Sequence, residues 1–264
     1  VYKRQNMDCN RWDLATKPDL IDYNIYWKDG KEDLEVPGLG RIPAKEVRFG
    51  RGHVSQPGVG HDTFADWQEL GLDHLGRPDN FLRRQIERWL KVRAEQPTRE
   101  LPQIQQLGKW LMDNVPDQGP VGIVHGDYHL DNTLCHQQRP ELLAVIDWEM
   151  ATIGDPLTDL GLLMMFWGPR GVSPPGFAHV QAASRRQGVA SRQELARVWS
   201  DASGIDTEHL DFYLCFAFWR LAAIVEGAYG LYMAGKVDTD YAKGLEHDVP
   251  ALLQEAAMAA KGEG

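Results

Sequence analysis

Residues 121–163 read VGIVHGDYHLDNTLCHQQRPELLAVIDWEMATIGDPLTDLGLL, and this stretch holds most of the chemical information in the chain. Two short apolar runs within it, 121–124 and 142–146, are bounded by polar residues and have the length of buried strands. Rigid strands that end in polar side chains are a common support for catalytic groups. The candidate catalytic residues that follow the two runs are Asp127, Asn132 and Asp147.

The spacing of His125, Asp127 and Asn132 matches the catalytic loop HRDLxxxN of protein kinases, with Gly126 in place of the arginine. Phosphoryl transfer needs a carboxylate that accepts the proton of the attacking hydroxyl group. It also needs oxygen ligands that hold Mg²⁺ against the nucleotide phosphates. The pattern therefore predicts a phosphotransferase site in which Asp147 supplies a second carboxylate.

Four segments extend the match beyond this generic signature. They are HGDYHLDN at 125–132, IDWE at 146–149, GDPLTDL at 154–160 and GRPDNFLRRQIERW at 76–89. Together they resemble the aminoglycoside phosphotransferase and choline kinase family. Within that family they are most similar to the phosphotransferase domains related to those fused to acyl-CoA dehydrogenases. The resemblance covers roughly residues 67–264 and implies a protein-kinase-like α+β fold, with a mainly helical C-lobe and a small β element.

The resemblance also implies a role for each residue of the motif. Asp127 would be the catalytic base that faces the acceptor hydroxyl group. Asn132 and Asp147 would coordinate Mg²⁺ and, through it, the co-substrate ATP. The implied reaction is transfer of a phosphoryl group to a hydroxyl group of a small molecule, either a hydroxyacyl compound or an aminoglycoside-like compound.

Three further residues are implied to support this site. His125 would hold the loop through backbone hydrogen bonds, and Asp155 would cap the following helix, where Pro156 occupies the first helical position. Asp159 would fix the catalytic loop from that same helix.

A metal hydrolase is an alternative explanation of the same octapeptide. His125, Asp127, His129 and Asp131 alternate, so on a strand they would share one face as metal ligands. That hypothesis leaves Asn132 and the IDWE segment unexplained, and we therefore favour the kinase-like interpretation. We expect His129 and Asp131 to be a solvent-facing loop pair.

Residues 79–264 are predicted to form the helical C-lobe that carries the catalytic loop. The helical patterns run from Asp79 or Asn80 to Pro97, up to Pro116, from a Ser191–Glu194 capping box onward, from Glu208 to Ala234, and from Asp240 with an interruption at Pro250. Arg220 and Glu226 lie within the most apolar of these helices. They would either line a substrate pocket or make buried, paired contacts.

Residues 1–78 are predicted to be a divergent or truncated N-terminal region, in part poorly ordered, with one strand at Ile21–Trp27. Gly50–Ser55 imitates a glycine-rich nucleotide loop, but no lysine occurs between Lys45 and Lys91 to grip the phosphates. A non-catalytic kinase-like lobe or fragment that lacks a functional nucleotide-binding N-lobe is therefore the alternative function. Such a chain would bind ATP weakly or not at all.

Composition narrows the class of protein. The chain has 28 Lys and Arg against 38 Asp and Glu, and the resulting net charge of −10 disfavours a nucleic-acid-binding protein. Its 3 cysteines are far apart and form no CxxC pair, which indicates a reducing compartment and excludes a cysteine-based zinc site. No signal peptide is visible, and charged residues interrupt the apolar run Phe212–Ala234. We therefore expect a cytoplasmic protein without a membrane span; the oligomeric state is not predicted.

Overall fold

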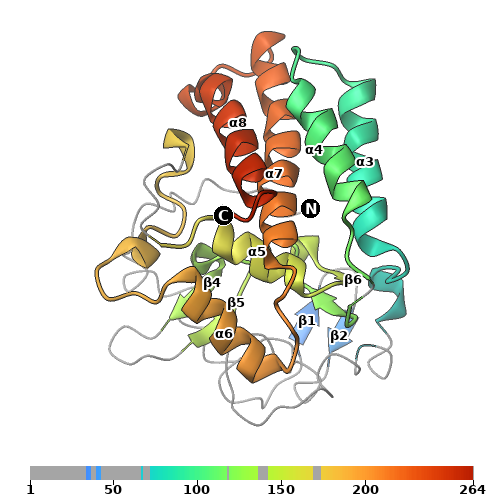
Figure 1. Cartoon of the computed structure of the whole chain (residues 1–264), viewed down its shortest axis with the longest axis vertical. Helices are drawn as coiled ribbons and strands as arrows, with labels where there is room; N and C mark the ends of the chain where they lie inside the picture. The colour runs from blue at the N-terminus through green and yellow to red at the C-terminus, as the bar shows by residue number, and fades with distance from the viewer. Residues whose placement is uncertain are drawn as a thin grey trace.

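Helices contain most of the residues that the computed structural model describes. The structure describes Trp67 and residues 72–117, 119–135, 142–168 and 174–263, together with two short strands at 34–36 and 40–42. The helices are α3 (Phe81–Glu95), α4 (Pro102–Asp113), α5 (Leu157–Met165), α6 (Arg192–Ser203), α7 (Leu210–Met233) and α8 (Asp240–Ala259) (Figure 1). The strands are β1 (Leu34–Val36), β2 (Gly40–Ile42), β3 (Gly122–Val124), β4 (Thr133–Cys135), β5 (Leu142–Val145) and β6 (Thr152–Gly154).

Helix α7 is the centre of the hydrophobic core. It packs against α8 along one side and against α3 and α4 along the other, and α5 crosses near its first turns (Figure 1). The run from Phe212 to Trp219 is buried without a break, as expected for a helix that is apolar on every face. Among the described helices, only α7 is long and apolar enough to cross a membrane. Its packing inside the bundle accounts for that composition.

The described strands pair in three antiparallel ribbons. β1 pairs with β2, β3 with β6, and β4 with β5. The register of β3 and β6 sets Val124 opposite Thr152, and that of β4 and β5 sets Thr133 opposite Val145. The chain that leaves β3 and the chain that leaves β5 meet, because His125 Nε2 lies 2.8 Å from the Ile146 carbonyl oxygen.

Most of the sequence-based elements are confirmed. The capping box is complete, because the Ser191 hydroxyl accepts from the Glu194 backbone and the Glu194 carboxylate accepts from the Ser191 backbone. Asn80 precedes α3 but lies in the left-handed region with φ of 52° and makes no side-chain cap. The two predicted strands exist, but each pairs with a three-residue strand too short to show a periodic pattern. The predictions at Ile21–Trp27 and Gly50–Ser55 lie outside the described residues.

The predicted interruption at Pro250 is wrong, because α8 continues through this residue. A proline inside a helix removes the N–H that would bond the carbonyl four residues earlier, here that of Glu246. The Arg99 guanidinium donates to this carbonyl at 2.8 Å and to the Leu245 carbonyl at 3.2 Å. An arginine from the α3–α4 connection therefore replaces the missing hydrogen bond.

Arg99 also neutralises the buried Glu226 of α7. Its Nη2 lies 3.0 Å from Glu226 Oε2 and its Nε lies 3.3 Å from Oε1, and the Thr98 hydroxyl donates to the same carboxylate. The Glu226 side chain is only 1% exposed. The guanidinium also stacks over the Tyr229 ring, at 4.2 Å from the centroid. Of the two expectations for Glu226, the buried pair is the one found.

We predict that Arg99→Ala lowers the free energy of unfolding by about 3–5 kcal/mol, because it removes the cationic partner of a buried carboxylate and the donor to a helix carbonyl. Urea denaturation of the purified protein measures this. Lys91→Ala is the control, since Lys91 pairs with Glu95 on the surface with both side chains largely exposed and should change stability by no more than about 1 kcal/mol. Equal losses in the two variants would contradict the prediction.

Candidate active site

The loop that leaves β3 is held by the carboxylate of Asp159, in the first turn of α5. The backbone N–H of His125 donates to Asp159 Oδ2 at 2.6 Å, and that of Gly126 donates to Oδ1 at 2.9 Å. Asp159 is buried, and charge-assisted hydrogen bonds to a buried carboxylate are short and strong. The position of the loop is thereby fixed relative to α5.

Gly126 allows the loop to turn at this point. Its φ is +83°, and a Cβ atom there would lie 2.6 Å from the carbonyl oxygen of Met150. Only glycine adopts this conformation at no steric cost. The Gly126 carbonyl accepts a hydrogen bond of 2.6 Å from Arg220 of α7. Arg220 thus makes a paired contact, the second of the two roles expected for it; burial lowers its pKa, whereas the charges of Asp159 and Asp127 act in the opposite direction.

His125 uses both of its ring nitrogens inside the protein. Nδ1 accepts from the Asp127 N–H at 3.2 Å, so the hydrogen bonds assign the ring proton to Nε2, which donates to the Ile146 carbonyl at 2.8 Å. The ring is buried and packs beside Trp148, with centroids 4.7 Å apart. His125 therefore has no nitrogen left for a metal ion, and the metal-hydrolase arrangement of this octapeptide loses its first ligand.

Asp127 and Asn132 lie side by side. The Asn132 amide nitrogen donates to the Asp127 backbone carbonyl at 2.8 Å and lies 3.3 Å from Asp127 Oδ2. Asn132 is buried, whereas the Asp127 side chain is 45% exposed. Because these contacts fix the orientation of the Asn132 amide, its Oδ1 is the atom that remains for a cation, and the carboxylate of Asp127 remains open to a solute.

Asp147 stands at the end of β5, next to the same loop. The N–H of Ile146 donates to the Asn132 carbonyl at 2.9 Å, so Asp147 is the next residue after the one that pairs with Asn132. Its side chain is exposed and its backbone is left-handed, with φ of 68° and ψ of 48°. Left-handed residues other than glycine are uncommon, and such strain is concentrated at functional sites.

The donor set fits a hard divalent cation. Asn132 and Asp147 offer an amide oxygen and a carboxylate, and Mg²⁺ is commonly held by one or two such protein ligands, with waters and substrate phosphates completing the octahedron. Within the described part of the chain, no group of three His, Cys, Asp or Glu side chains is arranged to hold a metal ion. A cation at Asn132 and Asp147 would therefore depend on the nucleotide for further ligands.

Asp155 lies apart from these groups, at the start of α5. Its Oδ1 accepts from the Leu157 N–H at 3.0 Å and its Oδ2 from the Tyr213 hydroxyl at 2.6 Å. Burial raises the pKa of Asp155, although both hydrogen bonds oppose the shift. This carboxylate stabilises the first turn of α5 and joins it to α7, so it acts on the loop only through the helix that carries Asp159.

His129 and Asp131 lie next to each other as expected, and Asp131 is exposed, whereas His129 is partly buried. Asp131 Oδ2 accepts from the Gln181 N–H at 2.8 Å, and it lies 3.5 Å from Nδ1 of His129, whose side chain is only 19% exposed. Although partial burial acts in the opposite direction, hydrogen bonds from His129 and the Gln181 backbone keep the pKa of Asp131 below its usual range. Sequence reasoning missed Gln181, because no motif marks it.

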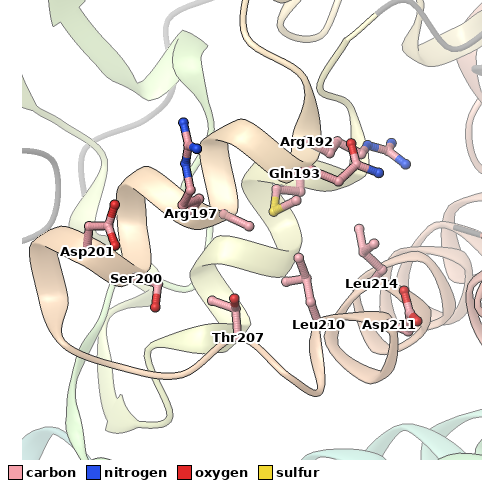
Figure 2. Close-up of a pocket in the computed structure, with 11 residues that line it drawn as sticks. Arg192, Gln193, Arg197, Ser200, Asp201, Thr207, Leu210, Asp211 and Leu214 are labelled. Carbon is pink, nitrogen blue, oxygen red and sulfur yellow. The ribbon is translucent and has the colours of Figure 1, made fainter.

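A separate hollow lies between α5, α6 and α7. It encloses about 390 Å³, and Figure 2 shows its side chains on α6 and at the start of α7 facing a common space. Arg192 is committed to the backbone there, donating to the carbonyls of Met165 and Trp167. No residue of the 125–132 loop or of the 146–149 segment lines this hollow, so it is distinct from the candidate active site.

Comparison with known proteins identifies relatives for most of the described chain. The sequence model of the phosphotransferase enzyme family matches residues 61–195. Acyl-CoA dehydrogenase family member 11 of Homo sapiens is 32% identical over 208 residues, which cover 77% of this chain and 26% of the human protein. A probable acyl-CoA dehydrogenase of Arabidopsis thaliana, IBR3, is 29% identical over 84% of this chain and 28% of its own length. The chain thus spans about a quarter of the length of the curated relatives it matches.

A solved structure shares the fold. A crystal structure from Ralstonia eutropha, described as a candidate aminoglycoside phosphotransferase, is 32% identical and superposes with a TM-score of 0.63. The match covers 74% of this chain and 60% of the other chain. The predicted kinase-like α+β architecture, mainly helical with a small β element, is thereby confirmed.

We predict that Asp159→Asn destabilises the protein by about 1–3 kcal/mol, because the amide of Asn would turn an N–H₂ donor toward one of two backbone N–H donors. Denaturant unfolding measures the loss, and amide hydrogen exchange should accelerate at His125 and Gly126. As a control, Asp113→Asn alters an exposed aspartate of α4 that pairs with Lys109, and should stay within about 0.5 kcal/mol of the parent protein. Unchanged exchange at the two loop amides would refute the assignment.

Proposed function

The chain belongs to the phosphotransferase enzyme family, and from this membership we propose that it transfers the γ-phosphoryl group of ATP to a hydroxyl group of a small molecule. The observation that carries the proposal is the cluster of Asp127, Asn132 and the chain end of β5 at one loop. This loop is fixed by buried hydrogen bonds, while the Asp127 carboxylate stays open to a solute.

In the proposed reaction Asp127 is the general base. The acceptor oxygen forms a bond to the γ-phosphorus, the bond from that phosphorus to the bridging β–γ oxygen breaks, and ADP leaves. The proton of the hydroxyl group passes to the Asp127 carboxylate. When bound, Mg²⁺ with ATP supplies the phosphoryl group and the positive charge that offsets the phosphates. Asn132 and Asp147 are the residues that would hold the cation.

The protein contributes position and electrostatics to this reaction. No covalent intermediate with the protein is needed, so the rate depends on how well the base and the cation ligands are oriented before the reactants arrive. The backbone contacts of Asp159, Arg220 and His125 support such orientation, because they fix the loop at three consecutive residues.

Two acceptor classes are compatible with this site. Relatives named as acyl-CoA dehydrogenase family members favour hydroxylated acyl compounds, including their CoA thioesters. The Ralstonia neighbour, described as a candidate aminoglycoside phosphotransferase, and the net charge of −10 favour a cationic aminoglycoside-like acceptor. We propose the hydroxyacyl class, because those relatives align with up to 77% of this chain. A cytoplasmic location is part of the proposal.

A second candidate function is that of a non-catalytic kinase-like lobe, which lacks a functional nucleotide-binding N-lobe. The specific observation in its favour is that no lysine occurs between Lys45 and Lys91, where a phosphate-gripping lysine of the N-lobe is expected. Calorimetric titration with Mg²⁺ and ATP separates the two functions. Micromolar affinity for the nucleotide would contradict a lobe without a nucleotide site, and absence of measurable nucleotide binding would support it.

We predict that Asp127→Asn lowers turnover at least about 100-fold, because the amide cannot accept the proton. A panel of hydroxyacyl compounds, their CoA thioesters and aminoglycosides is incubated with Mg²⁺ and ATP, and phosphorylated products are quantified by mass spectrometry. Asp113→Asn should retain full activity. Turnover of the Asp127→Asn variant at the parent rate would remove Asp127 from the mechanism.

The contributions of the backbone conformation and of the carboxylate of Asp147 can be tested separately. Asp147→Gly should raise the free energy of unfolding by about 1 kcal/mol, because glycine relieves the left-handed strain, and should abolish Mg²⁺-dependent turnover. Asn80→Gly is the matched control, since Asn80 is also left-handed and makes no side-chain cap. It should gain similar stability and keep its activity. Full activity in the Asp147→Gly variant would exclude the carboxylate as a Mg²⁺ ligand.

A further inference from the structure

The two carboxylate oxygens of Asp127 face different partners. Oδ2 lies 3.3 Å from the amide nitrogen of Asn132, and Oδ1 lies 3.8 Å from Nε2 of His129. The side chain is 45% exposed, so solvent leaves it free to rotate unless these neighbours hold it. One neighbour, Asn132, is a proposed cation ligand; the other, His129, has no role in the reaction described so far.

His129 is itself fixed from its far side. Its Nδ1 lies 3.5 Å from Asp131 Oδ2, the same oxygen that accepts from the Gln181 N–H at 2.8 Å. The imidazole ring therefore lies between two carboxylates, with Nε2 near Asp127 and Nδ1 near Asp131. The two ring nitrogens are separated by one carbon atom, so the rigid ring can contact both carboxylates at the same time.

Gln181 anchors this group to α5. It is fully buried and has a left-handed backbone with φ of 51°. Its Oε1 accepts from the Leu130 N–H at 3.1 Å, and its Nε2 donates to the Leu163 carbonyl at 2.7 Å. A continuous series of contacts therefore connects α5, through Gln181 and Asp131, to His129 and the carboxylate of Asp127.

We propose that His129 is a positioning residue for Asp127, an inference that rests on the proposed function because Asp127 is the proposed base. Through its contact with Oδ1, Nε2 of His129 already limits the rotation of Asp127 in the free protein. When the acceptor is bound, Nε2 donates to Oδ1 and turns the other oxygen toward the acceptor hydroxyl group. The present separation of 3.8 Å is longer than a hydrogen bond. Catalytic hydrogen bonds commonly shorten only in the complex with substrate.

Three substitutions of His129 distinguish the roles of its two ring nitrogens. Gln reproduces the nitrogen that faces Asp127, Asn reproduces the nitrogen that faces Asp131, and Ala reproduces neither. We expect His129→Ala to lower kcat by roughly 10- to 100-fold. The KM for ATP should stay unchanged, because the ion pairs of His129 are with Asp127 and Asp131 and not with the proposed cation ligands. His129→Gln should recover most of kcat, and His129→Asn should not. His209→Ala, at an exposed histidine before α7, should behave as the parent protein.

Crystal structures of the parent protein and the three variants provide a readout that does not depend on activity. The parent and His129→Gln should show Asp127 in one orientation, and His129→Ala should show it rotated or in several. An unchanged Asp127 in His129→Ala, or equal recovery of kcat by Asn and Gln, would overturn the proposal. If the parent transfers no phosphoryl group to any acceptor, the proposed function fails, and the orientation of Asp127 still decides the role of His129.

Discussion

The buried carboxylate of Asp159 is the constraint on which the rest of the site depends. A carboxylate removed from water is costly unless donors surround it, and here two consecutive backbone N–H groups of the loop supply them. These two hydrogen bonds fix the position of the loop relative to α5. Helix α5 is in turn joined to α7 by the hydrogen bond from Tyr213 to Asp155. The loop, α5 and α7 are therefore held together by hydrogen bonds. A displacement of any of them would change the position of Asp127.

The two charged residues in the middle of α7 help to satisfy backbone carbonyl groups that have no regular hydrogen-bond donor. Arg220 donates to the carbonyl of Gly126, at the turn where the loop leaves its strand. Glu226 binds Arg99, which donates to the Glu246 carbonyl left without its N–H by Pro250. Both lie on a helix that is otherwise apolar, where an unpaired charge would be expensive. Their presence is explained by the irregular segments on either side of the helix.

Features that depend on neighbouring residues could be predicted from the sequence, and those that depend on distant ones could not. The motif spacing around Asp127 and the capping box at Ser191 are local, and both are found. The continuity of α8 through Pro250 depends on an arginine far away in the chain, so the expected interruption was wrong. The hydrogen bond from the Gln181 backbone to Asp131 could not be predicted, because the position of Gln181 depends on its contact with α5. Short strands such as β4 and β6 show no period of their own.

The position that follows the loop histidine shows how this chain differs from the protein-kinase signature. That signature carries an arginine there, whereas this chain has Gly126, whose φ of +83° and close approach to the Met150 carbonyl exclude any side chain. A positive charge is nevertheless present, because Arg220 of α7 binds the Gly126 carbonyl and lies within the electrostatic reach of Asp127 and Asp159. The positively charged side chain near the base therefore belongs to the core helix α7 and not to the loop. Arg220 is fixed in the helical core, so its charge stays near Asp127 even if the loop moves. This arrangement favours a site whose base is oriented before the substrates bind.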